Sequence, residues 1–210
     1  MNTARVALHP ALHSYVERAL PAIETLEPAR RELLDSIAAF VKQQIAAGEP
    51  ARLVFICTHN SRRSHIGQLW ASAAAAWHGL EGVETFSGGT EATAFNPRAV
   101  AAMRDAGFEI EATTEGDNPR YRATVAEDGL ALEVFSKRYD DPANPTRDFA
   151  AVMTCTEADQ ACPHVEGAAL RIALPYVDPK ISDDTPEQAR IYGERVRQIG
   201  IEMLYLFSRV

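Results

Sequence analysis

The sequence predicts an α/β fold built around a four-stranded parallel sheet. Short apolar segments that resemble buried strands alternate with longer segments whose apolar residues recur at helical spacing, and this alternation is typical of a parallel sheet covered by helices. The strand-like segments end at turn residues or polar motifs, where parallel sheets carry their ligands. The 210 residues suffice for one domain with its own core, with or without an appendage.

Residues 1–50 are expected to form a helical extension ahead of this core. Apolar residues recur at helical spacing within residues 11–48, and Gly48-Glu49-Pro50 ends the run. A break near Pro21 indicates two or more helices. The core domain is then residues 51–210. We expect the extension to pack against this core or against a second copy of the chain, as in a homodimer formed through the N-terminal helices.

Seven core elements are expected after residue 51. The second strand ends at Gly88-Gly89, and Asn96-Pro97 and Gly107 are typical of a helix start and a helix end. In order, the elements are a strand at 53–56, a helix at 64–78, a strand at 83–87, a helix at 96–106, strands at 149–154 and 170–174, and a closing helix at 186–207.

One segment interrupts the alternation and predicts an inserted β-hairpin within residues 112–148. Strand-like residues 121–125 and 130–139 flank residues 126–129, which contain the hairpin-turn pair Asp128-Gly129. We expect this hairpin either to extend the edge of the sheet or to cover the functional site.

The composition argues against several classes of partner. Lys and Arg total 21 against 29 for Asp and Glu, so the formal charge is −8, and no basic excess exists to neutralise nucleic acid or a membrane surface. No apolar run approaches a bilayer span, and the first residues lack the apolar core of a signal peptide. Three cysteines do not describe a secreted disulfide scaffold. We therefore expect a cytoplasmic protein with reactive thiols and without a nucleic-acid or membrane partner.

Residues 57–64 carry the strongest functional signal. They follow the first strand and read Cys-Thr-His-Asn-Ser-Arg-Arg-Ser. A loop between a strand and a helix N-terminus turns backbone N–H groups toward an anion, and Arg63 adds a planar cation that matches two oxygens. The same positive field is expected to hold Cys57 as a thiolate, a sulfur nucleophile beside an anion receptor. The minor alternative is that Cys57 is an ordinary buried cysteine and that its spacing from Arg63 arose by chance. The predicted oxyanion-binding residues are Thr58, His59, Asn60, Ser61, Arg62, Arg63 and Ser64.

A second pair of cysteines follows the third core strand. Cys155 is expected at the same sheet edge as Cys57, and Cys162 lies seven residues further on. That spacing rises about 10 Å in a straight helix, so a disulfide between them requires the segment to bend or unwind. The pair is therefore a candidate redox switch. Two alternatives stay open: Cys155 as a simple core residue, and a metal site formed with His164.

Asp178 follows the fourth strand and precedes Pro179. A carboxylate at the end of a strand can reach the site, where its natural role is that of a general acid. Asp-Pro also forms ordinary turns. The nearby pair Asp183-Asp184 has the features of a solvated cap for a closing helix that begins near Pro186.

Together these residues resemble the low-molecular-weight protein tyrosine phosphatase superfamily and, within it, the thioredoxin-coupled arsenate reductases. The resemblance runs from about Arg52 to the C-terminus. The matching residues are the loop residues Cys57, Asn60, Arg63 and Ser64, the segments Ser87-Gly88-Gly89-Thr90 and Asn96-Pro97, the acid in Asp178-Pro179, and the Cys155 to Cys162 segment that ends in Cys-Pro. This resemblance implies a three-layer sandwich and a catalytic set of Cys57, Arg63, Cys155, Cys162 and Asp178.

The resemblance also implies a mechanism. Cys57 would attack arsenate, for which phosphate or sulfate is an analogue, with Ser64 stabilising the thiolate and Asp178 assisting loss of a hydroxyl. Cys155 and then Cys162 would carry the oxidation away as disulfides, and thioredoxin or a low-molecular-weight thiol would reduce the last one. No metal and no organic cofactor is needed.

Two other functions remain open at this stage. The same Cys57, Arg63 and Asp178 would serve a tyrosine phosphatase that forms a phosphocysteine, although that reaction leaves Cys155 and Cys162 without a role. Alternatively, the chain is a redox or oxyanion sensor without turnover, whose disulfide switches a partner surface on the N-terminal helices.

Overall fold

The central sheet has four parallel strands, as predicted. The computed structural model describes residues 7–126 and 131–210. The strand order is β2-β1-β6-β7, with β1 in the interior of the sheet. The bounds are β1 Ala51–Cys57, β2 Val83–Gly89, β6 Phe149–Met153 and β7 Ala168–Ala173. Strand β1 is buried at six of its seven positions, which agrees with its continuous apolar sequence.

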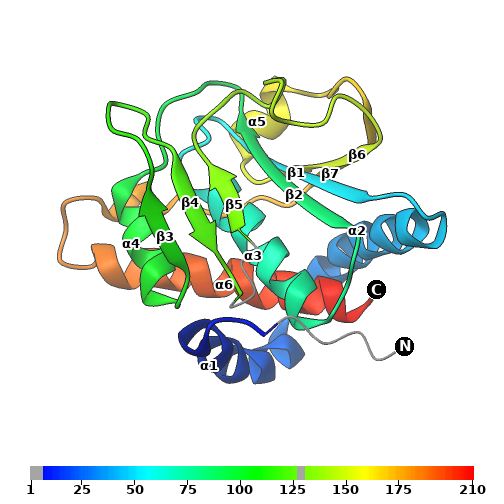
Figure 1. The fold of residues 1–210 in the computed structure, drawn as a ribbon, viewed down its shortest axis with the longest axis horizontal. Coiled ribbons are helices and arrows are strands. Elements are labelled where there is room, and N and C mark those ends of the chain that lie inside the picture. The colour runs from blue at the N-terminus through cyan, green and yellow to red at the C-terminus, as the bar shows by residue number, and fades with distance from the viewer. Residues whose placement is uncertain (1–6, 127–130) are drawn as a thin grey trace.

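Helices cover the two faces of this sheet unequally (Figure 1). Helices α2 and α3 pack on one face of the sheet, α6 packs on both of them, and α4 packs on α6. The short helix α5 packs on the other face against β1 and β6. The bounds are α2 Pro28–Ala46, α3 Arg63–Trp77, α4 Pro97–Asp105, α5 Thr156–Ala161 and α6 Gln188–Ser208. No helix in the described ranges is long and apolar enough to cross a membrane.

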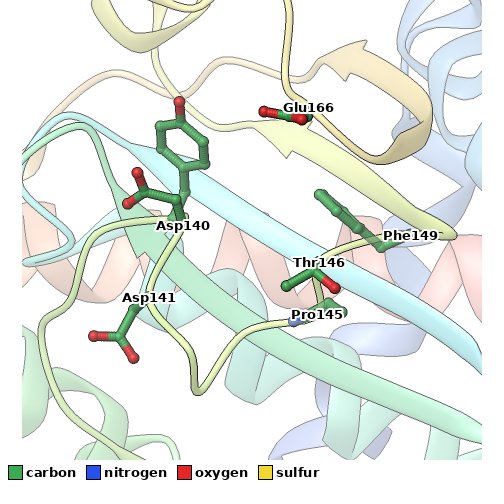
Figure 2. Close-up of a pocket in the computed structure, with 7 residues that line it drawn as sticks. Asp140, Asp141, Pro145, Thr146, Phe149 and Glu166 are labelled. Carbon is green, nitrogen blue, oxygen red and sulfur yellow. The ribbon is translucent and has the colours of Figure 1, made fainter.

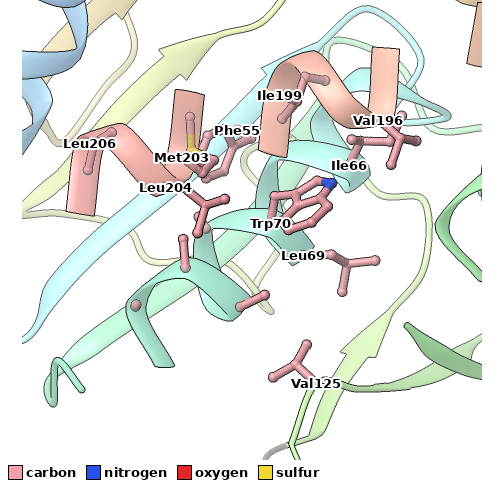
Figure 3. Close-up of a cluster of buried hydrophobic side chains, with 14 of the residues drawn as sticks. Phe55, Ile66, Leu69, Trp70, Val125, Val196, Ile199, Met203, Leu204 and Leu206 are labelled. Atoms are coloured by element: carbon pink, nitrogen blue, oxygen red, sulfur yellow. The ribbon is translucent and has the colours of Figure 1, made fainter. Parts of the chain in front are cut away.

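The larger hydrophobic core lies between the sheet and the helices α3 and α6 (Figure 3). Trp70 of α3 is fully buried at its centre, with the edge of its ring system against Phe108 at a centroid distance of 5.0 Å. Gly200 of α6 allows this packing, since a Cβ there would lie 2.7 Å from the Trp70 ring. Close packing of this kind fixes α6 against α3, the helix that follows the 57–64 loop.

The N-terminal extension is helical and breaks at Pro21, as expected. Helix α1 spans Pro10–Ala19, the 3₁₀ helix η1 spans Leu20–Thr25, and α2 follows. Apolar residues of α1 and α2, among them Leu12 and Leu34, belong to the same buried cluster as the core of the sheet domain. The division of the chain at residue 50 stays a prediction.

The insertion does not form a lone hairpin: it contributes the second and third strands of a three-stranded antiparallel sheet, and the first strand comes directly before it. The strands of this sheet are β3 Glu109–Ala112, β4 Tyr121–Thr124 and β5 Ala131–Val134, in the order β3-β4-β5. Most of the predicted turn lies outside the described residues. The second hairpin strand was predicted to reach residue 139, which is wrong. It ends at Val134, because from Ser136 on the chain turns to hydrogen-bond Asn118 and the 57–64 loop.

Candidate active site

Cys57 is the last residue of β1 and opens the loop to α3. In the sheet, β1 pairs with β2 on one side and with β6 on the other. The chain leaves β1 toward helix α3, on one face of the sheet, and leaves β6 toward helix α5, on the other face. Such a position is the crevice where open parallel sheets bind ligands. The side chain of Cys57 is buried.

Asn60 sets the shape of the loop. Its backbone φ is +43°, in the left-handed region that asparagine tolerates better than most residues. Its amide nitrogen donates to Ser64 Oγ at 2.9 Å, and its amide oxygen accepts from the backbone N–H of Lys137 at 2.8 Å. Because Asn60 is the donor to Ser64, the hydroxyl proton of Ser64 can point at Cys57 Sγ, 3.1 Å away. The loop thus places a hydrogen-bond donor on the candidate nucleophile.

The end of β2 must be glycine for this loop to fit. A Cβ built on Gly89 would lie 2.6 Å from the backbone nitrogen of Asn60 and 2.7 Å from the carbonyl oxygen of Thr58. Real Cβ contacts are essentially never this short, so only glycine lets β2 and the loop approach each other. The Gly-Gly pair that the sequence suggested as a strand end therefore also supports the oxyanion loop.

Arg63 and Asp178 meet across the crevice. Arg63 donates from Nη2 to Asp178 Oδ2 at 2.7 Å and from Nη1 to the carbonyl of Tyr176 at 3.0 Å. The Nε atom of Arg63 is buried and has no partner among the described residues, so it remains available to an oxyanion. The other oxygen of Asp178 accepts from Lys180 N at 3.0 Å. Both predicted residues therefore lie at one site, with the carboxylate held in a defined orientation.

Arg62 and Asp183 form a neighbouring network. The Arg62 side chain donates to Tyr192 OH at 2.8 Å and to Asp183 at 3.1 Å, and Tyr192 donates to the same carboxylate at 2.7 Å. Burial, together with the hydrogen bond to Asp183, raises the pKa of Tyr192 to about 12, so it remains a donor. Of the predicted oxyanion ligands, Arg62 can therefore contribute only its backbone.

The prediction of Asp183 as a solvated helix cap is wrong. Helix α6 begins at Gln188, and the partly buried Asp183 binds Arg62 and Tyr192 instead. These partners come from the oxyanion loop and from α6, so no local pattern around residue 183 indicated them.

The three cysteines are free thiols: Cys57 and Cys155 belong to one buried apolar cluster, and the partly buried Cys162 packs against it. Cys155 is fully buried at the N-cap of α5, and its sulfur lies 3.4 Å from Thr58 Oγ1 of the oxyanion loop. Burial raises the pKa of this thiol, while the Thr58 hydroxyl acts in the opposite direction. Cys162 lies at the other end of α5 and packs with Tyr139 against the same cluster. The fold thus brings Cys57 together with Cys155, which is 98 residues later in the sequence, and with Cys162, which is a further 7 residues on.

Other predicted ligands have ordinary roles. His59 is half-exposed beside Glu91, at 3.6 Å, and its carbonyl accepts from Thr93 and Ser136. Within the described residues, no group of three or more His, Cys, Asp or Glu side chains is arranged to hold a metal ion. His164 therefore has no such set around it in that part of the chain.

Sequence reasoning missed the contribution of the segment after β5. Ser136 donates to the carbonyl of His59, and the backbone of Lys137 donates to Asn60. The Lys137 side chain is buried, and burial lowers its pKa to about 8. The run Ser136-Lys137-Arg138 reads as exposed polar sequence, so no local signal identified it.

A hollow of about 330 Å³ lies away from the oxyanion loop, on the α5 side of the sheet (Figure 2). No residue of the 57–64 loop lines it. The lining residues are Tyr139, Asp140, Asp141, Pro145, Thr146, Phe149 and Glu166. The three carboxylates repel an oxyanion, so anion chemistry belongs at the Cys57 loop.

Comparison with known proteins identifies the fold. No family model matches the chain. A YwlE mutant from Bacillus subtilis aligns at a TM-score of 0.50 with 16% identity, covering 75% of this chain and 97% of that one. A low-molecular-weight protein tyrosine phosphatase from T. tengcongensis aligns at 0.50 with 14% identity, covering 76% and 99%.

Sequence comparison points to one group of proteins. An arsenate reductase of Bacillus licheniformis is 28% identical over 149 residues, which are 70% of this chain and 88% of the relative. One from Brevibacillus brevis is 27% identical over 144 residues, covering 68% and 86%. The chain has the low-molecular-weight protein tyrosine phosphatase fold, and arsenate reductases are its sequence relatives. The resemblance predicted from the loop, the acid and the cysteine pair is confirmed at this level.

Proposed function

We propose that the chain is an arsenate reductase that works by a three-cysteine relay. The observation that carries the proposal is the cluster that holds Cys57 and Cys155 and against which Cys162 packs, with the sulfur of Cys155 hydrogen-bonded to Thr58 of the oxyanion loop. A phosphatase needs only the first of these cysteines. The curated relatives named arsenate reductase support the same choice.

The first step uses the loop and the two charged residues beside it. Loop amides and the unpaired Nε of Arg63 hold the arsenate. Cys57, whose sulfur is hydrogen-bonded to the Ser64 hydroxyl, attacks arsenic. Asp178 gives a proton to the departing hydroxyl, which leaves as water. The product is a cysteine–arsenate adduct with arsenic still in its oxidised state.

Two thiol–disulfide exchanges then complete the reduction. Cys155 attacks the sulfur of Cys57, and the electron pair of the sulfur–arsenic bond stays with arsenic, which leaves as arsenite. Cys162 attacks Cys155 and frees the thiolate of Cys57. The segment between Cys155 and Cys162 is a helix of six residues, α5, so forming this disulfide requires the helix to unwind. A dithiol such as thioredoxin, or a low-molecular-weight thiol, supplies the two electrons that restore Cys155 and Cys162.

The decisive variant is Cys162→Ser. We expect it to release about one arsenite per chain and then stop, because the Cys57–Cys155 disulfide has no resolving thiol. The measurement is arsenite formed in a quench, beside arsenate-dependent NADPH oxidation with thioredoxin and thioredoxin reductase. Cys57→Ser is the matched control and should form none.

Continuous thioredoxin-coupled reduction by Cys162→Ser would refute the relay. An aryl phosphate assay on the same preparation tests the alternative chemistry. Wild-type hydrolysis of aryl phosphate without any arsenate reduction would show a phosphatase instead.

A further inference from the structure

An ionic cluster joins the N-terminal extension to the candidate active site. Arg30 of α2 contacts the buried carboxylate of Glu202 on α6, with Nε at 3.0 Å and Nη2 at 2.8 Å from the same oxygen. Tyr176 donates its hydroxyl to that oxygen at 2.7 Å. The guanidinium of Arg30 also lies over the Tyr176 ring, 4.7 Å from its centroid. Arg30 therefore holds both the ring of Tyr176 and the acceptor of its hydroxyl.

Tyr176 in turn holds Arg63. Its carbonyl oxygen accepts from Arg63 Nη1 at 3.0 Å, while Nη2 of the same guanidinium binds Asp178, two residues further along the chain. The backbone N–H of Tyr176 donates to Thr154, directly before Cys155. A shift of Tyr176 would therefore move the acceptor that orients the arginine of the oxyanion site.

The cluster depends on the charge of Arg30. Glu202 is 1% exposed and Tyr176 4% exposed, and a buried carboxylate without a cation is costly. Gln198 contacts the second oxygen of Glu202 at 3.3 Å, and Arg195 of α6 contributes positive charge nearby. Burial, and then the neighbouring carboxylate, raise the pKa of Tyr176 well above its usual value, so its hydroxyl stays a donor to Glu202. Among the described residues, only Arg30 both pairs with Glu202 and stacks on the ring of Tyr176.

We propose that Arg30 is a positioning residue: through Glu202 and Tyr176 it sets the orientation of Arg63 for oxyanion binding. This assigns the N-terminal extension a role at the site, which it meets through α2. The inference builds on the proposed function but concerns anion affinity, which can be measured without turnover.

The test compares two neighbouring arginines of α2. Arg31 also lies over a tyrosine ring, that of Tyr205 at 5.6 Å, and donates to backbone carbonyls, but it does not contact Tyr176. We expect Arg30→Met to raise the dissociation constant for phosphate, measured by titration calorimetry, about tenfold, which is about 1.4 kcal/mol. Arg31→Met should leave it within about twofold. Both variants should lower the thermal midpoint of unfolding, so a loss of stability alone does not explain a difference in phosphate affinity between them.

A second variant keeps the test sharp if Arg30→Met folds poorly. Tyr176→Phe removes one hydroxyl, and we expect it to weaken phosphate binding as well. In that background Arg30→Met should add no more than about a twofold effect, because the link through the hydroxyl is already cut and only the ring contact remains. Equal effects of Arg30→Met and Arg31→Met, or full additivity of Arg30→Met with Tyr176→Phe, would overturn the inference.

The proposed function can fail separately. If the variants change phosphate affinity as expected but the wild type does not reduce arsenate, the reductase is refuted and the positioning role stays intact. A wild-type chain that binds neither phosphate nor arsenate would overturn both.

Discussion

At the scale of single residues, Asn60 shows how one side chain can organise a site. Its backbone takes the left-handed conformation that turns the loop. Its amide nitrogen donates to Ser64, and its amide oxygen accepts from the backbone of Lys137. An aspartate would tolerate the same backbone but has no N–H to give to Ser64. The pattern Cys-x5-Arg-Ser predicted the loop, whereas the partner on the insertion could only come from the structure.

Lys137 gives a prediction about pH. Its side chain is buried near His65 and over the Phe135 ring at 4.5 Å, and the charges of Asp141, Glu133 and Arg120 act on it from neighbouring segments. Burial lowers its pKa from 10.5 to about 8. Between pH 8 and 10.5 the unfolded chain keeps a proton that the folded chain releases, so this residue makes the folded state more stable as pH rises.

We expect the free energy of unfolding of the wild type, minus that of Lys137→Met, to increase by about 3 kcal/mol from pH 7.5 to pH 10.5. Urea titrations of both proteins at intervals of half a pH unit measure this difference. A difference that does not change with pH would contradict the buried, low-pKa lysine, and so would one that falls.

At the scale of elements, the site depends on three strand ends that meet. Cys57 pairs with Gly89 at the last position of the β1–β2 ladder, and Cys155 follows β6 on the other side of β1. Strands β1 and β6 were predicted from their apolar sequences, and β2 was predicted to end at Gly88-Gly89. Strand β3 was missed, since its four residues bury only Ile110 and are too short for a periodic signal.

Gly89→Ala tests the close approach of β2 to the loop. The added methyl would overlap the backbone of Thr58 and Asn60, so we expect phosphate binding to fall at least tenfold and the free energy of unfolding to drop by about 1–3 kcal/mol. Calorimetric titration and urea denaturation measure the two effects.

Gly193→Ala is the matched control for that substitution. Gly193 lies within α6 with nothing within 4 Å of its built Cβ, so alanine there should stabilise the protein by up to about 1 kcal/mol and leave phosphate affinity unchanged. Normal phosphate binding by Gly89→Ala would show that the loop can move away from β2.

At the scale of the whole molecule, one buried cluster runs from Leu12 of α1 to Phe207 of α6. Leu34 of α2 and Trp70 of α3 belong to it, and both are fully buried. Burial of this kind couples elements that are distant in sequence, so the N-terminal helices are expected to unfold together with the sheet.

We expect Leu34→Ala to lower the free energy of unfolding of the whole chain by about 2–5 kcal/mol, in a single transition. Far-ultraviolet circular dichroism and the fluorescence of the two tryptophans, Trp70 and Trp77, should give the same midpoint. Separate transitions, with only the early one shifted by Leu34→Ala, would show instead that residues 1–50 fold as an independent unit.

Local pattern was sufficient for much of this protein. The strands of the parallel sheet, the helices α3, α4 and α6 and the Cys57 loop follow from apolar runs, caps and motif spacing, because each of these depends on residues close together in the chain. The six-residue helix α5 was not predicted. The tertiary structure alone decided which side chains face one another. It paired Arg63 with Asp178, placed Cys155 beside Thr58, buried Lys137 and connected Arg30 to Tyr176. Those contacts join segments separated by about 80 to 170 residues, and they form only when the whole core packs.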